Sequence, residues 1–353
     1  MSKFWSPLAA SLVPYVPGEQ PKDKKYVKLN TNENPYPPSP AALEAMADAV
    51  NGDLRLYPDP TADELVRAAA DYCGLSPAQT FVGNGSDEVL AFAFAAFFDP
   101  AKPVLFPDIT YSFYKVYATL YGLSPKLIPL DDEFHIPLEQ FAGEHGGIIM
   151  PNPNAPTAQL LALEEIRDLL ERNPDNVVII DEAYIDFGGE SAASLVPEYP
   201  NLLVVQTLSK SRSLAGLRVG LAFGSEELID GLNRIKNSFN SYTMDRVALR
   251  GAVASLRDEA YFRETTAKVV ATRERVTEQV LGLGFRATDS KANFLFISHP
   301  RFPASELFAK LRERGVLVRY FNSPRIDNYL RVSVGTDEEM DMFLAALKGI
   351  VSD

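Results

Sequence analysis

The sequence is poor in cysteine and histidine and has no long apolar run. Cys73 is the only cysteine in 353 residues, so no disulfide can form within the chain, and a reducing compartment is expected. The three histidines, His135, His145 and His299, are scattered among loop-like residues, which predicts surface positions and no metal site. The longest apolar run, residues 89–98, is far too short to cross a bilayer.

Basic residues are scarce relative to acidic ones. The chain has 34 lysines and arginines against 47 aspartates and glutamates, and its formal net charge of −13 argues against nucleic acid or an anionic membrane as a partner. Residues 1–20 contain three prolines and lack the apolar core of a signal peptide. We therefore expect a soluble, cytoplasmic protein whose anionic ligands, if any, are small molecules bound at local basic sites.

The sequence does contain a long alternation of strand and helix patterns. Short apolar runs alternate with helical segments through most of the chain, which predicts an α/β fold with a large doubly wound, mostly parallel sheet. A helical stretch of some 40 residues begins near residue 239 and leads into a second, smaller alternation. We expect an N-terminal arm (1–40), a large domain (41–245) and a small α+β domain (246–353).

Lys210 lies in a polar loop that follows an apolar run, residues 202–205. Such a run predicts a buried strand, and open α/β sheets bind ligands at the carboxyl ends of their strands. Arg212 and Arg218 would lower the pKa of a lysine used for covalent chemistry. Ser209 and Arg218 could bind a phosphate. A lysine for an aldehyde beside a phosphate site indicates pyridoxal 5′-phosphate, although a solvated basic loop is the alternative.

Polar or aromatic residues also follow other strand patterns. Residues 83–88, GNGSDE, form a bend before a helix, where Ser86 and Asp87 mark an anion site or simply complement the helix dipole. Tyr111 begins a helix after the next strand, where its ring could lie on a flat cofactor. Most other aromatics of that helix are expected in the core or an interface.

Two more loops carry groups that need partners. In residues 151–157, PNPNAPT, either Asn152 or Asn154 could direct an amide into a site, and a proline-rich turn is the alternative. Asp181 ends the apolar run 177–180, and a buried carboxylate is costly unless it is paired. The protonated ring nitrogen of the cofactor would be a suitable partner.

Two arginines lie in apolar strand patterns near the C-terminus. Arg319 belongs to VLVRY, and Arg331 to YLRVSVG. Either they bind an anionic ligand, or they are edge-strand residues whose charged ends reach water.

Together, these segments resemble the fold-type I pyridoxal-phosphate aminotransferases of the class II subfamily, and among them the histidinol-phosphate aminotransferases. The most specific segments are LNTNENPYPPSP, LRLYPDP, GNGSDE, PNAPT, DEAYIDF, TLSKSRSLAGLRVG and YLRVSVGT. The resemblance covers nearly the whole chain. It implies a homodimeric enzyme with pyridoxal 5′-phosphate as its cofactor and a large domain that binds it.

The resemblance also implies roles for single residues. Lys210 would link covalently to the cofactor and then move protons, Asp181 would pair with the pyridinium nitrogen, and Tyr184 would bond the phenolate oxygen. Tyr111 would stack on the ring. The phosphate would be bound by Ser86, Asp87, Ser209 and Arg218, with Tyr57 reaching in from the partner subunit.

The asparagine loop departs from the family pattern. Ala155 stands where the asparagine nearest Pro-Thr would be, and Ala158 replaces the usual glycine. The contact to the ring oxygen is therefore assigned to Asn154, with Asn152 as the other option.

The resemblance assigns substrate binding to Tyr15, Arg319 and Arg331. Arg331 corresponds to the arginine that binds the α-carboxylate of the substrate in related aminotransferases. Histidinol phosphate has no such carboxylate, so its phosphate must take that arginine, whereas glutamate and 2-oxoglutarate use it through a carboxylate.

The implied reaction converts histidinol phosphate and 2-oxoglutarate to imidazole-acetol phosphate and glutamate in histidine biosynthesis, with ping-pong kinetics. An aromatic amino-acid aminotransferase and a threonine-phosphate decarboxylase of the same fold are the alternatives. A non-catalytic binding protein is a third, against which the presence of both Lys210 and Asp181 argues.

Overall fold

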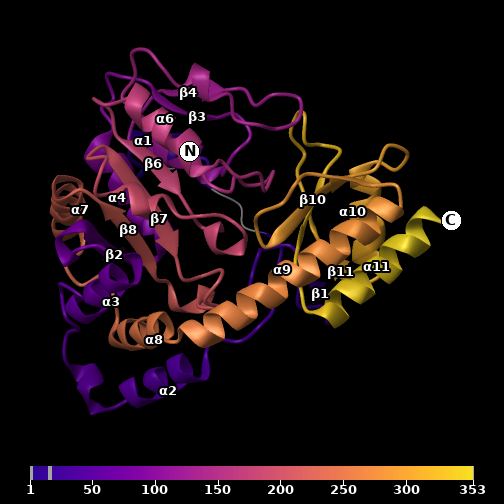
Figure 1. The fold of residues 1–353 in the computed structure, drawn as a ribbon, viewed down its shortest axis with the longest axis horizontal. Coiled ribbons are helices and arrows are strands. Elements are labelled where there is room, and N and C mark those ends of the chain that lie inside the picture. Colours follow the sequence, from indigo (N-terminus) through magenta and orange to yellow (C-terminus); the bar gives the residue numbers. More distant parts are fainter. Residues whose placement is uncertain (1–2, 15–17, 353) are drawn as a thin grey trace.

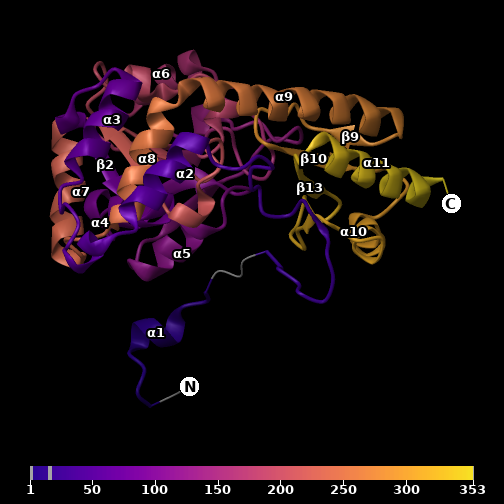
Figure 2. The same cartoon turned by 90° about the horizontal axis from the view of Figure 1, so that it is seen from below.

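The structure is a computed structural model that describes residues 3–14 and 18–352. A large α/β unit and a smaller unit lie side by side, and one long helix, α9 (Glu259–Gly282), runs from the first to the second (Figure 1). The short helix α1 (Pro7–Ser11) stands apart from both units (Figure 2). Within the described residues, no helix is long and apolar enough to cross a membrane.

The large unit is organised around a seven-stranded sheet. Its order is β2 (Thr80–Gly83), β8 (Gly220–Gly224), β7 (Leu202–Thr207), β6 (Val178–Asp181), β5 (Gly147–Pro151), β3 (Val104–Pro107) and β4 (Pro125–Ile128). β8 is antiparallel to both neighbours, and the other pairs are parallel. The predicted α/β class with a mostly parallel sheet is thereby confirmed.

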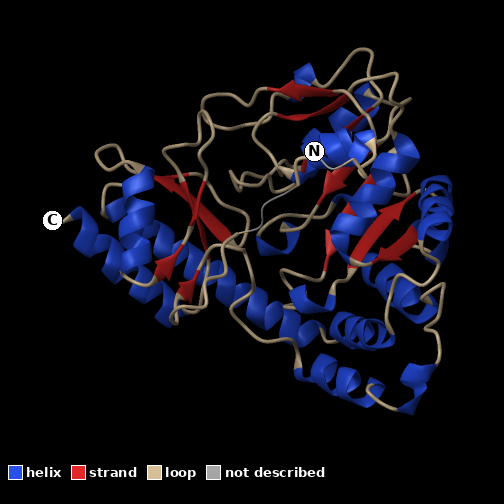
Figure 3. Ribbon diagram, turned by 180° about the vertical axis from the view of Figure 1, so that it is seen from behind, coloured by secondary structure: helices blue, strands red, loops and turns tan. Residues whose placement is uncertain are grey.

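Helices cover both faces of this sheet (Figure 3). α4 (Gly85–Phe97), α5 (Phe113–Leu120) and α7 (Glu226–Phe239) pack on the face that carries Ile179 and Leu203. α3 (Asp63–Cys73), α6 (Leu163–Arg172) and α8 (Arg246–Arg257) pack on the face that carries Ile180 and Leu202. Successive side chains of a strand point to opposite faces of the sheet. A sheet covered by helices on both faces therefore needs apolar residues at every position of its strands, as the sequence has.

The smaller unit contains a four-stranded antiparallel sheet of β12 (Arg319–Tyr320), β13 (Leu330–Ser333), β10 (Phe294–Ser298) and β9 (Arg286–Ala287). It packs against α9, α10 (Ala304–Glu313) and α11 (Asp337–Val351). β1 (Val27–Lys28) pairs with β11 (Val316–Leu317), so the N-terminal segment joins the small unit. α8 packs on α3 and α2 (Pro40–Ala49). The predicted boundary at residue 246 stays a prediction, and we propose on this packing that the boundary lies nearer α9.

Short 3-10 helices connect several of these elements: η1 (Gly52–Arg55), η2 (Pro77–Gln79), η3 (Leu138–Gln140), η4 (Ile185–Phe187), η5 (Ala192–Leu195) and η6 (Ala215–Leu217).

The prediction that all three histidines lie at the surface was partly wrong, because His145 and His299 are both buried. Each ring has polar partners in the interior: Nε2 of His145 lies 2.8 Å from Oδ1 of Asn173, and Nδ1 of His299 accepts from the backbone N–H of Arg301. Polar partners remove the cost of burying an imidazole.

Candidate active site

A cavity of about 740 Å³ lies where the carboxyl ends of β5, β6 and β7 face the small sheet. Ten of the residues singled out in the sequence line it: Ser86, Asp87, Tyr111, Asp181, Tyr184, Ser209, Lys210, Arg218, Arg319 and Arg331. Asn154 and Tyr57 are not among the lining residues, and Tyr15 lies outside the described residues. The carboxyl ends of parallel strands meet at one edge of a sheet, which is why loops distant in sequence converge here.

The Lys210 loop is held by the N-terminal segment. The side-chain amide of Asn34 donates to the carbonyls of Lys210 and Ser211, at 3.0 and 3.2 Å. The Lys210 amine lies 3.5 Å from the carbonyl of Thr31 and is half-buried in the cavity wall. The hydroxyl of Ser211 donates to the carboxylate of Asp186. The lysine therefore sits on a loop fixed from two sides.

Asp181 is a buried carboxylate with one oxygen paired and the other unpaired. Oδ2 accepts a 2.8 Å hydrogen bond from the hydroxyl of Tyr114, which is itself completely buried. Oδ1 is buried and has no hydrogen-bond partner among the described residues. Burial raises the pKa of Asp181 to about 6. Sequence reasoning missed Tyr114, because a tyrosine on a core-facing helical stripe has the same sequence pattern whether or not its hydroxyl meets a carboxylate.

The N-terminus of α4 approaches β8 very closely at one end of the cavity. A Cβ at Gly220 would lie 2.4 Å from the backbone carbon of Gly85, and a Cβ at Gly85 would lie 2.4 Å from Nη2 of Arg218. A side chain at Gly220 would therefore collide with the backbone of α4, and one at Gly85 would displace the Arg218 guanidinium from the helix N-terminus. There Arg218 lies 3.2 Å from the Asp87 carboxylate, and both side chains are nearly half exposed.

Two serines lie at the same end of the cavity. Ser86 belongs to the first turn of α4, and Ser209 follows β7. The Thr207 hydroxyl lies 2.9 Å from the Ser209 hydroxyl and accepts from the Ser209 backbone N–H. N–H groups at a helix N-terminus, two hydroxyls and a guanidinium together are groups suited to bind a phosphate.

Two tyrosines occupy the walls between these groups. The Tyr111 hydroxyl donates to Asp87 at 3.0 Å, and burial raises the pKa of this phenol far above its usual value. The Tyr184 hydroxyl accepts from the amide of Asn32 at 3.0 Å, and its ring packs edge-on against Phe294. Sequence reasoning did not single out Asn32, although it lies inside the segment LNTNENPYPPSP that supported the resemblance.

Both asparagines of the asparagine loop are hydrogen-bonded within the protein. The Asn152 amide donates to the Leu161 carbonyl and accepts from the Leu161 N–H. Both amide hydrogens of Asn154 are engaged, by the carbonyl of Ile109 and the hydroxyl of Thr157. Ala155, rather than either asparagine, lines the cavity. The ring-oxygen contact assigned to Asn154 stays a prediction.

The small sheet supplies two arginines at the other end of the cavity. Arg319 and Arg331 are direct cross-strand partners on β12 and β13. Both guanidinium groups lie near the ring of Phe321, at 5.6 and 5.7 Å from its centroid. Arg331 also donates to the carbonyl of Asn30 at 3.0 Å. Two guanidinium groups on adjacent strands form a site suited to a dianion.

Arg325 is a further charged residue that sequence reasoning missed. It lies in the loop between β12 and β13 and reaches the large unit, where it pairs with Asp108 at 3.1 Å. It also donates to the carbonyls of Leu130 and Asp131, at 2.8 and 2.6 Å. Both Arg325 and Asp108 line the cavity. This contact joins the two units at the cavity wall.

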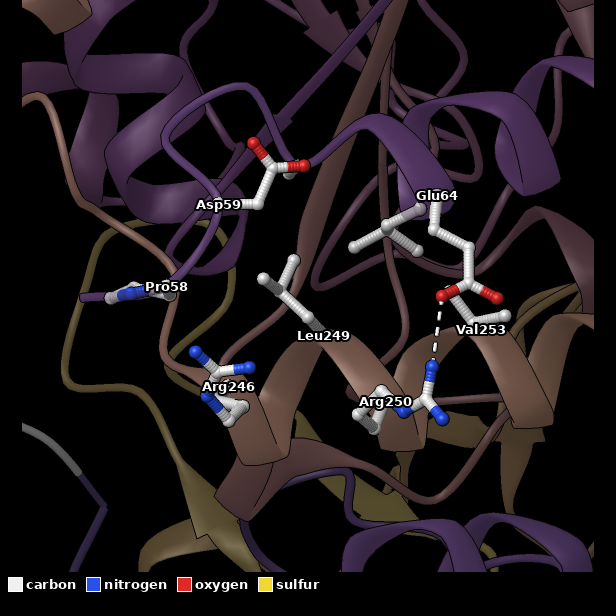
Figure 4. Close-up of a pocket in the computed structure, with 9 residues that line it drawn as sticks. Pro58, Asp59, Glu64, Arg246, Leu249, Arg250 and Val253 are labelled. Carbon is white, nitrogen blue, oxygen red and sulfur yellow. Dashed lines mark hydrogen bonds and ion pairs between the residues drawn. The ribbon is translucent and has the colours of Figure 1, made fainter. Parts of the chain in front are cut away.

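Tyr57 lies away from this cavity, on the outside of the large unit. Its side chain is 79% exposed, and its ring stacks on Tyr242 at 4.7 Å. Arg246 donates to the Tyr57 carbonyl at 3.3 Å. The same arginine lines a smaller cavity of about 170 Å³ between the start of α3 and α8, shown in Figure 4 with the Glu64–Arg250 ion pair. Tyr57 is thus a fixed, outward-facing aromatic.

The residues around the large cavity fit the cofactor predicted from the sequence. The unpaired oxygen of Asp181 requires a cationic or N–H partner, which a protonated pyridine nitrogen would supply. The α4 N-terminus with Arg218 fits a phosphate, and Lys210 supplies the amine for an aldehyde. All three groups line one cavity.

Comparisons with known proteins agree with this chemistry. The profile of the family "Aminotransferase class I and II" matches residues 24–347. The chain is 58% identical to the histidinol-phosphate aminotransferase of Clostridium acetobutylicum, with 100% of each chain covered. It is 57% identical to that of Clostridium beijerinckii, covering 100% of this chain and 99% of the relative.

Solved structures share the fold at lower sequence identity. The histidinol-phosphate aminotransferase of Sinorhizobium meliloti in complex with pyridoxal 5′-phosphate superimposes with a TM-score of 0.88 at 24% identity, covering 100% of this chain and 98% of that one. An aspartate aminotransferase of Thermus thermophilus with maleate gives a TM-score of 0.80 at 20% identity, covering 92% of each chain.

Proposed function

Because this chain belongs to the aminotransferase class I and II family, whose cofactor is pyridoxal 5′-phosphate, we propose that it is a histidinol-phosphate aminotransferase. It transfers the amino group of histidinol phosphate to 2-oxoglutarate and forms imidazole-acetol phosphate and glutamate, reversibly, as a step of histidine biosynthesis. We infer a cytoplasmic location from that biosynthetic role.

The observation that carries the substrate assignment is the arginine pair on the small sheet. Arg319 and Arg331 lie opposite each other on β12 and β13, away from the α4 N-terminus that suits the cofactor phosphate. A second anion site in the same cavity supports a substrate with its own phosphate. Glutamate places a carboxylate at Arg331, so one cavity serves both half-reactions.

The side chains divide the chemistry among them. When bound, pyridoxal phosphate supplies the carbonyl that accepts the amino group and a ring that withdraws electrons from the substrate carbon. Lys210 would hold the cofactor in the resting enzyme, and its amine would move the proton at the carbon that carries the substrate amino group. Asp181 would keep the ring nitrogen protonated, and Tyr184 would donate to the ring oxygen.

Tyr114 acts through Asp181. Its hydroxyl occupies one carboxylate oxygen and leaves the other without a partner, so that this oxygen would be available to the ring nitrogen. Hydrogen bonding to the charged form favours ionisation, which opposes the burial that raises the pKa of Asp181. The tyrosine therefore helps to keep the carboxylate charged and oriented.

A spectral titration of the cofactor-loaded protein tests the proposed function. Histidinol phosphate, L-glutamate and L-phenylalanine are added separately, and the loss of the lysine-bound cofactor band is followed. We expect conversion with histidinol phosphate and with glutamate. Conversion with phenylalanine but not with histidinol phosphate would make the aromatic aminotransferase the better assignment. Release of carbon dioxide from threonine phosphate would favour the decarboxylase.

A homodimer is part of this proposal. Large apolar side chains are exposed in the chain segments that carry Tyr57 and its stacking partner: Val50, Leu54, Leu56, Phe239 and Tyr242. An exposed apolar patch of this kind is typical of an interface. The stacking of Tyr57 on Tyr242 and the bond from Arg246 hold Tyr57 outward, which suits a residue that completes the partner's phosphate site.

Mixed dimers test whether Tyr57 acts in the partner's site. Lys210→Ala and Tyr57→Ala chains are each prepared alone and then mixed under conditions that exchange subunits. If Tyr57 acts in trans, the mixed dimer has one complete site, and activity reappears. A mixture as inactive as its components would place Tyr57 in its own subunit.

A further inference from the structure

Asn32 is a buried residue where three segments of the chain meet. It is 1% exposed and belongs to the N-terminal segment, and its neighbours are Ser333 on β13 and Tyr184 after β6. Its backbone has a φ of 55°, in the left-handed region. Asparagine tolerates this region better than most residues. The Asn32 carbonyl accepts from the amide of Asn293 at 3.0 Å, so the backbone is held as well.

Ser333 holds the Asn32 amide from one side. The Ser333 hydroxyl oxygen accepts from the Asn32 backbone N–H at 2.8 Å. Its own hydrogen is then donated to Oδ1 of Asn32 at 2.9 Å. Since Oδ1 faces the serine, the NH₂ group faces Tyr184, and it donates to the phenol oxygen at 3.0 Å. In this orientation both ends of the amide have a partner, and the phenol oxygen is the acceptor.

This bond leaves the Tyr184 hydrogen available to the cavity. A phenol oxygen that accepts from an amide must direct its own hydrogen elsewhere, and Tyr184 lines the cavity. No group in residues 3–14 or 18–352 accepts that hydrogen. Donation by Asn32 also polarises the phenol and strengthens its outgoing hydrogen bond.

The ring of Tyr184 borders an apolar cluster, which supports the ring but does not orient the hydroxyl. Tyr184 packs against Ala155, Ala158, Ala292 and Phe294, which are all apolar. A phenol surrounded in this way depends on a partner from another direction for its orientation. Asn32 occupies that position.

We propose that Asn32 is a positioning residue that directs the Tyr184 hydrogen to the ring oxygen of the cofactor. This inference rests on the role given to Tyr184 in the proposed function. Tyr184 touches the cofactor in that role, and Asn32 acts through it. Asn32 thereby tunes the proton affinity of the cofactor through Tyr184.

The test is a spectrophotometric pH titration of the cofactor-loaded protein without substrate. Donation to the ring oxygen favours its anionic form, so weaker donation raises the pH midpoint of the absorbance change. Asn32→Gly removes the side chain and suits the left-handed backbone. We expect its midpoint to rise by about 0.5 to 1 pH unit, which corresponds to one ordinary hydrogen bond.

Asn32→Asp provides a sharper variant of the same shape. A carboxylate accepts rather than donates, so it would take the Tyr184 hydrogen away from the cavity. We expect a larger rise than for Asn32→Gly, approaching that of Tyr184→Phe. Asn173→Ala is the matched control, because it removes another buried asparagine with several hydrogen bonds, away from the cavity lining. Its midpoint should equal that of the wild type.

A double-mutant cycle with Tyr184→Phe decides between positioning and general structural damage. If Asn32 acts through the phenol, Asn32→Gly shifts the midpoint in the wild type but not in the Tyr184→Phe background. Equal shifts in both backgrounds would overturn the proposal, as would an unshifted Asn32→Gly midpoint beside a shifted one for Tyr184→Phe. If Tyr184→Phe itself leaves the midpoint unchanged, the role of Tyr184 in the proposed function fails instead.

Discussion

The two ends of the cavity are built in different ways. At the large-sheet end, functional groups follow buried strands, and hydrogen bonds tie them to packed neighbours, as the Asp181–Tyr114 pair illustrates. At the small-sheet end, Arg319 lies on a two-residue strand, and the adjacent loop is held to the large unit by Arg325. Groups fixed by buried packing suit chemistry common to every substrate. Groups on a short edge strand and a loop suit the choice between substrates.

One short segment joins the two ends. Residues 30–34 place the Asn30 carbonyl on Arg331, the Thr31 carbonyl near Lys210 and the Asn32 amide on Tyr184. The N-terminal segment therefore aligns the substrate arginine with the cofactor side chains. The contrast between the ends leads to five predictions, in decreasing order of expected effect.

Lys210→Ala should abolish turnover and the absorbance band of the lysine-bound cofactor, because the other lysine in the described cavity lining, Lys115, belongs to α5 and not to the loop after β7. Absorbance spectra of the loaded protein and a transamination assay measure both effects. Survival of the band would remove Lys210 from its assigned role.

Asp181→Asn should leave the cofactor bound but slow proton removal from the substrate by several orders of magnitude, because a neutral ring withdraws electrons poorly. Single-turnover kinetics with a deuterated substrate isolate this step. Tyr114→Phe should slow the same step less, because the Asp181 carboxylate is retained but loses the hydrogen bond that orients it. Near-normal turnover of Asp181→Asn would exclude the pairing with the ring nitrogen.

Arg319→Ala should weaken the use of histidinol phosphate about ten- to a hundredfold relative to glutamate, since a dianion gains more from a second guanidinium than a carboxylate does. Arg331→Ala should damage both half-reactions. The measurement is kcat/KM for each amino donor, taken as a ratio to wild type so that general damage cancels. Equal losses for both donors in Arg319→Ala would favour the aromatic aminotransferase.

Acid should weaken cofactor binding through Asp181. Its pKa is raised to about 6, so below that pH the carboxyl becomes protonated and can no longer pair with a protonated ring nitrogen. The affinity of the apoprotein for pyridoxal phosphate should fall by up to about tenfold per pH unit below pH 6, as expected for one linked proton. The phosphate titrates in the same range, so the comparison is with Asp181→Asn, whose profile should lack this component.

Arg325→Ala should have the smallest effect, a rise in KM of up to about fivefold for both donors, because ion pairs with solvent-accessible members contribute little. The effect should shrink at high salt. Asp108→Asn is the matched variant, and the double variant should be no worse than either single one. A change confined to kcat would argue against a contact that only holds the two units together.

Much of the large-sheet end could be predicted from the sequence. Lys210, Asp181 and Ser86 each follow a strand pattern directly, and strand ends of a parallel sheet converge whatever the details of packing. The order and class of the elements follow from the same alternation of patterns. By contrast, the close approach of Gly85 to Gly220 depends on tertiary packing and could not be predicted, although both residues lie in segments that supported the family resemblance.

Tertiary structure alone decided which partner each polar side chain has. The Tyr114 hydroxyl meets a carboxylate 67 residues away, and the Asn32 amide meets a phenol 152 residues away. The sequence pattern of Tyr114 is that of a core residue, and the two asparagines of PNPNAPT look alike until their bonds to Leu161 and Ile109 are seen. The hydrophobic periodicity of a sequence indicates only on which face of a helix or strand a side chain lies. Hydrogen-bond partners depend on distances of a few tenths of an ångström between segments far apart in the chain, which only the packed structure determines.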